Sequence, residues 1–234
     1  MKRIKAILSA VLAVMICMGV CGCMRNQDKI DRMVSYINEK YADDTFVYQS
    51  MSGGHMGSNV TKIVVSSEKY PDDVIRVICS ETDQGEVFSD TYLNIKFKEQ
   101  TAQHLKSRLT EEYGENIYFK YIPDDVASME NGSSETTFEE YITEQDACIY
   151  FSAAVSKSVT DETADAEAER VKALLSDSTV SGHIYFIGEE VVLAQADGET
   201  TAREYIREKK YDKQLYFIKK TVDEYTKIEW ADGK

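Results

Sequence analysis

The stretch Ala147-Cys-Ile-Tyr-Phe-Ser-Ala-Ala-Val155 and the two segments after it decide the fold class. This stretch is short, apolar and bounded by polar residues, which predicts a buried strand. Residues 161–176 carry apolar side chains at a helical period, and this stripe predicts a helix packed on a sheet. Gly182-His-Ile-Tyr-Phe-Ile187 predicts the next strand. The alternation predicts an α+β protein in which amphipathic helices pack on mostly antiparallel sheets.

The first part of the chain follows the same pattern. Periodicity and turn residues predict helices over residues 28–41 and 92–113 and strands over residues 45–51, 60–66, 74–80, 86–89 and 116–122. The turns between these strands are short, which favours antiparallel hairpins. A meander covered by helices is therefore expected.

The end of the chain is predicted less completely. We expect a short helix after Thr136, a strand over residues 190–196 that pairs with 182–187 across Gly188, a helix over 201–210 and a strand over 214–219. The context of Trp230 near the C-terminus predicts no element.

The polar, turn-prone residues 124–135 are a candidate linker. They would separate two α+β halves, residues 28–123 and 136–234. The triplets Ile117-Tyr-Phe119 and Ile184-Tyr-Phe186 end similar strand–helix–strand segments. Either a duplication of the segment or a similar residue preference of two sheet strands explains this repeated triplet.

The N-terminal segment has the pattern of a secretory signal. Three positive charges within residues 1–5 precede an almost unbroken apolar run over residues 6–20. The run ends in Val20-Cys21-Gly22-Cys23. This ending resembles the lipobox of bacterial lipoproteins, in which an aliphatic residue, two small residues and a cysteine are recognised together.

The resemblance implies that residues 1–22 are removed as a signal peptide and that Cys23 becomes the lipidated first residue. Residues 23–27 would then be a tether, and the protein would lie on the cell membrane, facing the outside. A transmembrane helix is the alternative anchor, although the apolar run is slightly short for a bilayer. Cys21 is the alternative lipidation site.

The chain is strongly acidic. Its formal net charge is −14, and loss of residues 1–22 removes three basic residues and no acidic one, which makes the mature charge −17. Such a surface repels phosphate backbones and anionic headgroups, so we expect neither nucleic-acid binding nor a lipid-docking face. A solvated acidic surface is the default, and a specific basic partner is the alternative. A protein or peptide is the kind of partner considered.

Two cysteines remain after processing and lipidation, Cys79 and Cys148. Both lie in apolar runs that predict strands. They are a candidate disulfide pair outside the cell, or two buried free thiols.

One loop is a candidate binding site. Gly53, Gly54, His55, Met56 and Gly57 lie between two predicted strands. Glycine-rich loops can present backbone N–H groups to an anion, and imidazole with thioether can bind a soft metal. However, the sequence has no Walker ending and no GxGxxG, so a hairpin connection is the default.

Catalytic chemistry has little support in the sequence. The three histidines, His55, His104 and His183, occur without an HExxH or GxSxG motif. We therefore predict no catalytic residue, metal or cofactor. The leading hypothesis is a noncatalytic binding or accessory module, and the alternative is a lipid-tethered hydrolase with a dispersed active site. The scattered tyrosines suit core and rim packing, or a recognition surface.

Overall fold

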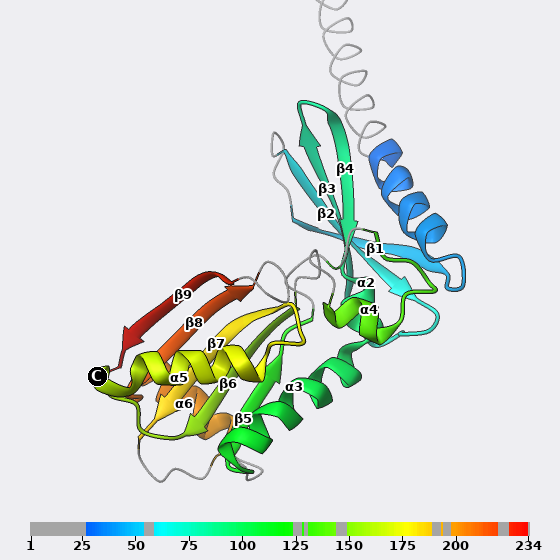
Figure 1. The fold of residues 1–234 in the computed structure, drawn as a ribbon. Coiled ribbons are helices and arrows are strands. Elements are labelled where there is room, and N and C mark those ends of the chain that lie inside the picture. The colour runs from blue at the N-terminus through cyan, green and yellow to red at the C-terminus, as the bar shows by residue number, and fades with distance from the viewer. Residues whose placement is uncertain are drawn as a thin grey trace, which may run out of the picture. The chain divides into compact units, whose positions relative to one another are not determined.

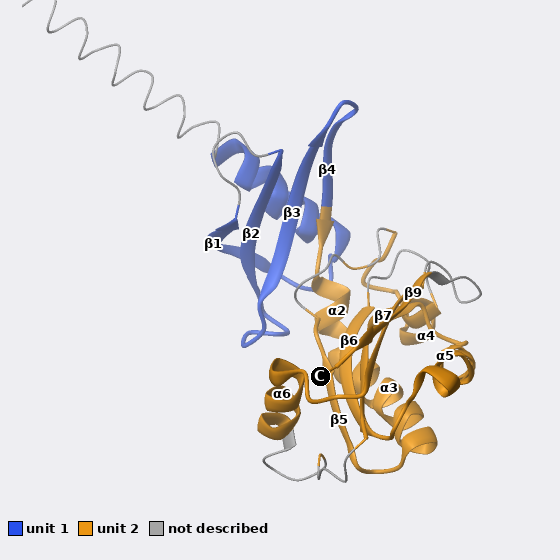
Figure 2. Cartoon of the chain, turned by 90° about the vertical axis from the view of Figure 1, so that its left-hand side faces the viewer, with its two compact units in different colours: residues 1–88 blue, residues 89–234 orange. Residues whose placement is uncertain are grey.

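The structure is a computed structural model that describes residues 27–53, 59–123, 128, 131–143, 149–188, 193, 198–219 and 225–233. The chain divides into two compact units, unit 1 (Met1–Phe88) and unit 2 (Ser89–Lys234) (Figures 1 and 2). Each unit combines helices with its own sheet, and antiparallel strand pairs dominate both sheets. The predicted α+β class is confirmed.

Unit 1 contains a helix over residues 27–40 and a four-stranded sheet of order β1-β2-β3-β4. The strands are β1 (Phe46–Gly53), β2 (Val60–Ser67), β3 (Ile75–Thr82) and β4 (Gly85–Asp90). β2 pairs antiparallel with both β1 and β3. The helix lies against one face of this sheet (Figure 2).

The core of unit 1 follows from the alternation of its strands. Ile63 and Val65 on β2 and Val77 on β3 are fully buried on the helix side, where Met33 and Ile37 are also fully buried. Further contacts fix the helix on the sheet: Arg32 pairs with Glu86 at 2.8 Å, Lys29 pairs with Glu81 at 2.7 Å, and the Tyr36 and Phe88 rings stack 5.4 Å apart. Among the described residues of unit 1, no helix lies on the opposite face of the sheet.

Unit 2 contains a five-stranded sheet of order β5-β6-β7-β8-β9. The strands are β5 (Ile117–Tyr121), β6 (Ile149–Ser156), β7 (Val180–Ile187), β8 (Lys213–Lys219) and β9 (Tyr225–Asp232). β6 and β7 are parallel, and the other neighbouring pairs are antiparallel. The parallel pair needs a crossover, which the helix between these strands supplies.

Helices of unit 2 lie on both faces of this sheet. The helices are α2 (Tyr92–Lys96), α3 (Lys98–Tyr113), α4 (Phe138–Thr143), α5 (Asp161–Leu174) and α6 (Gly198–Glu208). α3 and α5 lie on one side of the sheet, and α6 lies on the other (Figure 2). On the α3 and α5 side, Phe151 contacts Phe217, and Phe186 contacts Tyr113 of α3. This side holds most of the core of unit 2.

The boundary between the units differs from the expected linker. Residues 124–135 lie between β5 and β6, which pair directly through Tyr118 and Ala154. Because β5 pairs with β6, residues 117–121 belong to unit 2. The chain divides after Phe88 and not within residues 124–135. A duplication, one of the two explanations left open for the repeated triplet, has no counterpart in topology, because β3 and β5 belong to different sheets whereas β6 and β7 are neighbours.

Two expectations for the C-terminal part need correction. β7 has β6 on one side and β8 on the other, so the predicted pairing of residues 190–196 with it is wrong. Of that range the structure describes Leu193 alone. The tail around Trp230, which predicted no element, forms β9 and pairs with β8. Trp230 packs on Phe186, and this long-range contact explains its place in a strand.

Candidate functional site

A recurrent triplet gives the sheet of unit 2 one tyrosine-rich face. Four strands carry an aliphatic residue, a tyrosine and a phenylalanine in succession, at residues 117–119, 149–151, 184–186 and 215–217. Successive side chains of a strand point to opposite faces. The aliphatic and phenylalanine residues therefore face α3 and α5, and the tyrosines Tyr118, Tyr150, Tyr185 and Tyr216 share the other face. The repeated triplet in the sequence is thus explained by strands of one sheet that share the same inward and outward residue types.

α6 covers one end of this face. Tyr118, Ala154 and Ile187 are buried there in a cluster with Ala202 of α6, and Tyr185 and Tyr205 pack against the cluster. Tyr150, His183 and Tyr216 lie farther along the strands and are half-buried. We call Tyr150, His183, Tyr185 and Tyr216 the tyrosine–histidine face.

The rings of this face pack on one another. His183 is directly opposite Tyr216 in the β7–β8 register, and their rings stack with centroids 4.6 Å apart. The His183 ring also stacks on Tyr185 at 6.0 Å, and Tyr150 meets it edge-on at 5.8 Å. The Lys227 Nζ lies 5.2 Å from the Tyr216 ring centroid. Because the rings cover each other's faces, their edges and hydroxyl groups are what remains for contact with a ligand.

The electrostatics of this face suit hydrogen bonding better than proton transfer. Burial raises the pKa of Tyr150, and burial with Tyr211 and Tyr150 nearby raises the pKa of Tyr185 to about 12. Burial also lowers the pKa of His183, whose Nδ1 contacts the Gln214 side-chain amide. At pH 7 the phenols are therefore protonated donors and the imidazole is neutral.

The raised pKa of Tyr185 predicts a loss of stability at alkaline pH. An unfolded tyrosine has a pKa of about 10, so the folded state holds its proton more tightly. This contribution to stability is complete below about pH 10 and is lost as the pH rises towards the folded pKa of about 12. In urea unfolding, the free energy of unfolding should fall less steeply over this range in Tyr185→Phe than in the wild type. Equal slopes would contradict the assignment.

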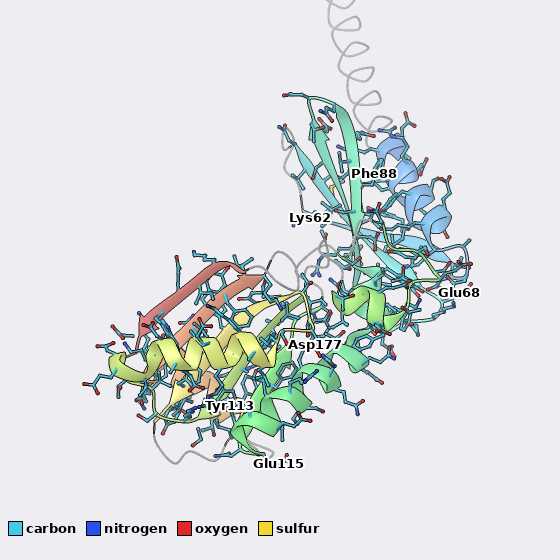
Figure 3. The ribbon with its side chains drawn as sticks, in the orientation of Figure 1. Lys62, Glu68, Phe88, Tyr113, Glu115 and Asp177 are labelled. Atoms are coloured by element: carbon cyan, nitrogen blue, oxygen red, sulfur yellow. The ribbon has the colours of Figure 1, made fainter. Side chains whose placement is uncertain are left out.

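A second cluster joins a serine, a histidine and an aspartate. The His104 Nε2 of α3 lies 3.4 Å from the Ser178 Oγ and 3.8 Å from the Asp177 Oδ1. Asp177 is labelled in Figure 3. Both oxygens approach the same ring nitrogen, whereas a nucleophilic relay uses opposite nitrogens. Ser178 is fully buried and donates its hydroxyl proton to Asp177, which also pairs with Arg108. The arrangement ties α3 to the turn after α5.

A shallow depression of about 440 Å³ lies beside this cluster, lined by side chains of α3 and by Phe138 of α4. His104 and Arg108 reach its wall. The buried Ser178 does not line it, so the depression offers no route from a bound substrate to that hydroxyl. No sequence motif predicted this cluster, because His104 and Ser178 are 74 residues apart and meet only through the packing of α3.

The structure describes only some of the other predicted site residues. Gly53 ends β1, and Gly54, His55, Met56 and Gly57 lie outside the described residues, as does Cys23. His183 belongs to the tyrosine–histidine face, and His104 belongs to the α3 cluster.

The cysteine prediction stays open. Cys79 is fully buried on β3, and burial raises the pKa of its thiol. This thiol is free in the described part of the chain, and Cys148 lies outside that part. The pairing of the two cysteines stays a prediction.

The described residues contain neither a candidate metal centre nor a candidate membrane span. Among the residues whose placement is described, no three His, Cys, Asp or Glu side chains gather closely enough to hold a metal ion. In the same part of the chain, no helix is both long and apolar enough to span a bilayer.

Comparisons with known proteins give little beyond the structure itself. No family model matches the chain, and no curated protein matches it either. Among solved structures, the chain is similar to a DUF5037 family protein from Ruminococcus gnavus, with 13% sequence identity and a TM-score of 0.35. That match covers 83% of this chain and 93% of the other.

Proposed function

We propose that the protein is a lipid-anchored extracytoplasmic binding module that holds a protein or peptide partner on its tyrosine–histidine face. The lipobox-like sequence that ends at Cys23 supports the anchor and the location outside the cell. The four aliphatic–tyrosine–phenylalanine triplets support the binding role, because they place their tyrosines on one face of the sheet, where Tyr150, Tyr185 and Tyr216 are half-buried. This face is the observation that carries the proposal.

The chemistry of the face favours a protein or peptide. Tyrosine supplies a large contact area with little loss of side-chain entropy, and it is enriched where proteins recognise one another. The hydroxyl groups of Tyr150, Tyr185 and Tyr216 can donate hydrogen bonds, and the Gln214 amide contacts the His183 ring. A sugar or a base binds by stacking on an exposed ring face. The His183 ring already stacks on Tyr185 and Tyr216, so it suits such a ligand less well. Backbone carbonyls and side-chain oxygens of a polypeptide suit the exposed edges better.

Site-specific photo-crosslinking in the producing cell tests the binding role. A photoreactive phenylalanine derivative replaces Tyr150 in one variant and Glu169, an exposed residue of α5, in the control. Light should join a defined protein to the variant at position 150 and not to the control. Identical adducts at both positions, or an adduct at neither, would contradict a partner at this face.

A further inference from the structure

The sheet of unit 1 has an open face whose composition departs from that of the whole chain. By strand alternation, the residues opposite the helix side include Val47, Val64, Ile78 and Val87, together with Lys62 and Arg76. The register agrees, since Val64 pairs with Arg76 and Lys62 pairs with Ile78. Figure 3 places Lys62 on the side of the sheet away from the helix and Phe88 beside the helix. We call these six residues the open face of unit 1.

The open face combines four aliphatic residues with two cations and carries no acid. Ser50, Ser66 and Ser80 lie on the same side of the sheet, since Ser50 pairs with Val64, Ser66 with Val47 and Ser80 with Val60. On the four strands of unit 1 the acidic residues are Glu81, Glu86 and Asp90, and the first two point to the helix, where they pair with Lys29 and Arg32. Asp90 is fully buried. The chain as a whole has 41 acidic and 27 basic residues, so an acid-free face with two cations is unusual for it.

Large apolar side chains are exposed at both edges of this face. Val47 on β1 is 55% exposed, and Val87 on β4 is 47% exposed. Val64 and Ile78, on the central strands, are partly exposed between them. An apolar surface that spans a sheet in this way marks a contact with another apolar phase or molecule.

We propose that the open face of unit 1 docks on an anionic lipid surface. This inference rests on the proposed lipid anchor, because residues 23–27 would hold unit 1 within about 14 Å of the bilayer, at about 3.5 Å per residue. Aliphatic side chains gain from entering the interface, and each lysine or arginine near an anionic leaflet contributes about 1 kcal/mol. A second copy of the chain fits less well, since a face-to-face pair would bring its own cations together.

Depth-dependent quenching tests the docking. The full acylated chain is reconstituted in vesicles of phosphatidylcholine and phosphatidylglycerol with brominated acyl chains, which quench nearby tryptophans. The single native tryptophan is removed by Trp230→Phe, and a new one is introduced by Val87→Trp or, as the control, by Glu39→Trp on the exposed side of the helix. Quenching several-fold stronger at position 87 than at position 39 is expected. Equal quenching at the two positions would overturn the proposal.

Reversing the charge of Lys62 distinguishes electrostatic docking of the open face from proximity that the lipid anchor alone would cause. Lys62→Glu, added to the Val87→Trp variant, should shift the docking equilibrium by at least about fivefold towards the undocked state. Lys106→Glu makes the same charge change on the exposed side of α3 and should leave quenching unaltered. Equal responses to the two reversals, or quenching that persists in pure phosphatidylcholine, would contradict an anionic lipid partner.

Failure of the anchor has a different signature from failure of the docking face. Protein without an acyl group would not float with the vesicles, which would contradict the proposed function. The same protein mixed with an excess of anionic vesicles would still show quenching at position 87 if the open face binds lipid. Acylated protein that floats without this quenching would retain the anchor and exclude the docking.

Discussion

Gly182→Val should strongly destabilise unit 2, with a loss of at least about 3 kcal/mol in the free energy of unfolding. Gly182 lies on β7 between Phe151 of β6 and Phe217 of β8. A Cβ atom at this position would lie 2.4 Å from the Phe151 carbonyl oxygen and 3.2 Å from a carbon of its ring. The nearest of these atoms belongs to the backbone of β6, so relief of the clash requires a shift of the strand. The Phe151 and Phe217 rings meet 5.7 Å apart beside this position. Urea unfolding followed by far-ultraviolet circular dichroism measures the loss.

Ser181→Val is the matched control for Gly182→Val. Ser181 precedes Gly182 on the same strand, points to the opposite face and is partly exposed. A β-branched residue suits a strand, so we expect a change within about 1 kcal/mol. A similar loss in both variants, or a Gly182→Val protein as stable as the wild type, would show that the glycine does not serve the contact between the phenylalanine rings.

Cys23→Ala should abolish incorporation of labelled fatty acid and release the protein from the membrane-lipid anchor. The thiol of Cys23 is the group that would carry the lipid, and alanine has no nucleophile to replace it. Cys21→Ala is the matched control, because it removes the neighbouring thiol of the same segment and should stay labelled. Label that persists in Cys23→Ala and disappears in Cys21→Ala would move the anchor by two residues.

Local periodicity was sufficient to predict most elements of the fold. The helix over residues 27–40 and the meander of unit 1 were evident because their signals lie within single segments and short turns. The pairing of β5 with β6 could not be predicted in this way, because the two strands are far apart in the sequence and no local pattern specifies a distant strand partner. The strand that contains Trp230 was missed for a similar reason, since its alternation is imperfect and its partner is β8.

The candidate site could have been predicted in part. The similar triplets at residues 117–119, 184–186 and 215–217 were consistent with strands of similar composition. The triplet at residues 149–151 would have strengthened that interpretation. Strand alternation alone places each tyrosine opposite its aliphatic and phenylalanine neighbours. The stacking of His183 between Tyr185 and Tyr216 required the strand order, which no local pattern contains.

The docking proposed for the open face of unit 1 departs from the expectation based on average charge. The net charge of −14 favoured a surface that repels anionic headgroups. Net charge describes the far field of a protein, whereas docking depends on the side chains within a Debye length of the surface. The strands of unit 1 place their acidic residues on the helix side, and the opposite face keeps Lys62 and Arg76.

The mass of the N-terminal peptide of the protein, extracted from membranes of the producing cell, tests the central claim most directly. We predict a peptide that begins at Cys23 and carries acyl chains on it. A peptide that retains residues 1–22 with an unmodified Cys23 would contradict the lipid anchor and the location derived from it.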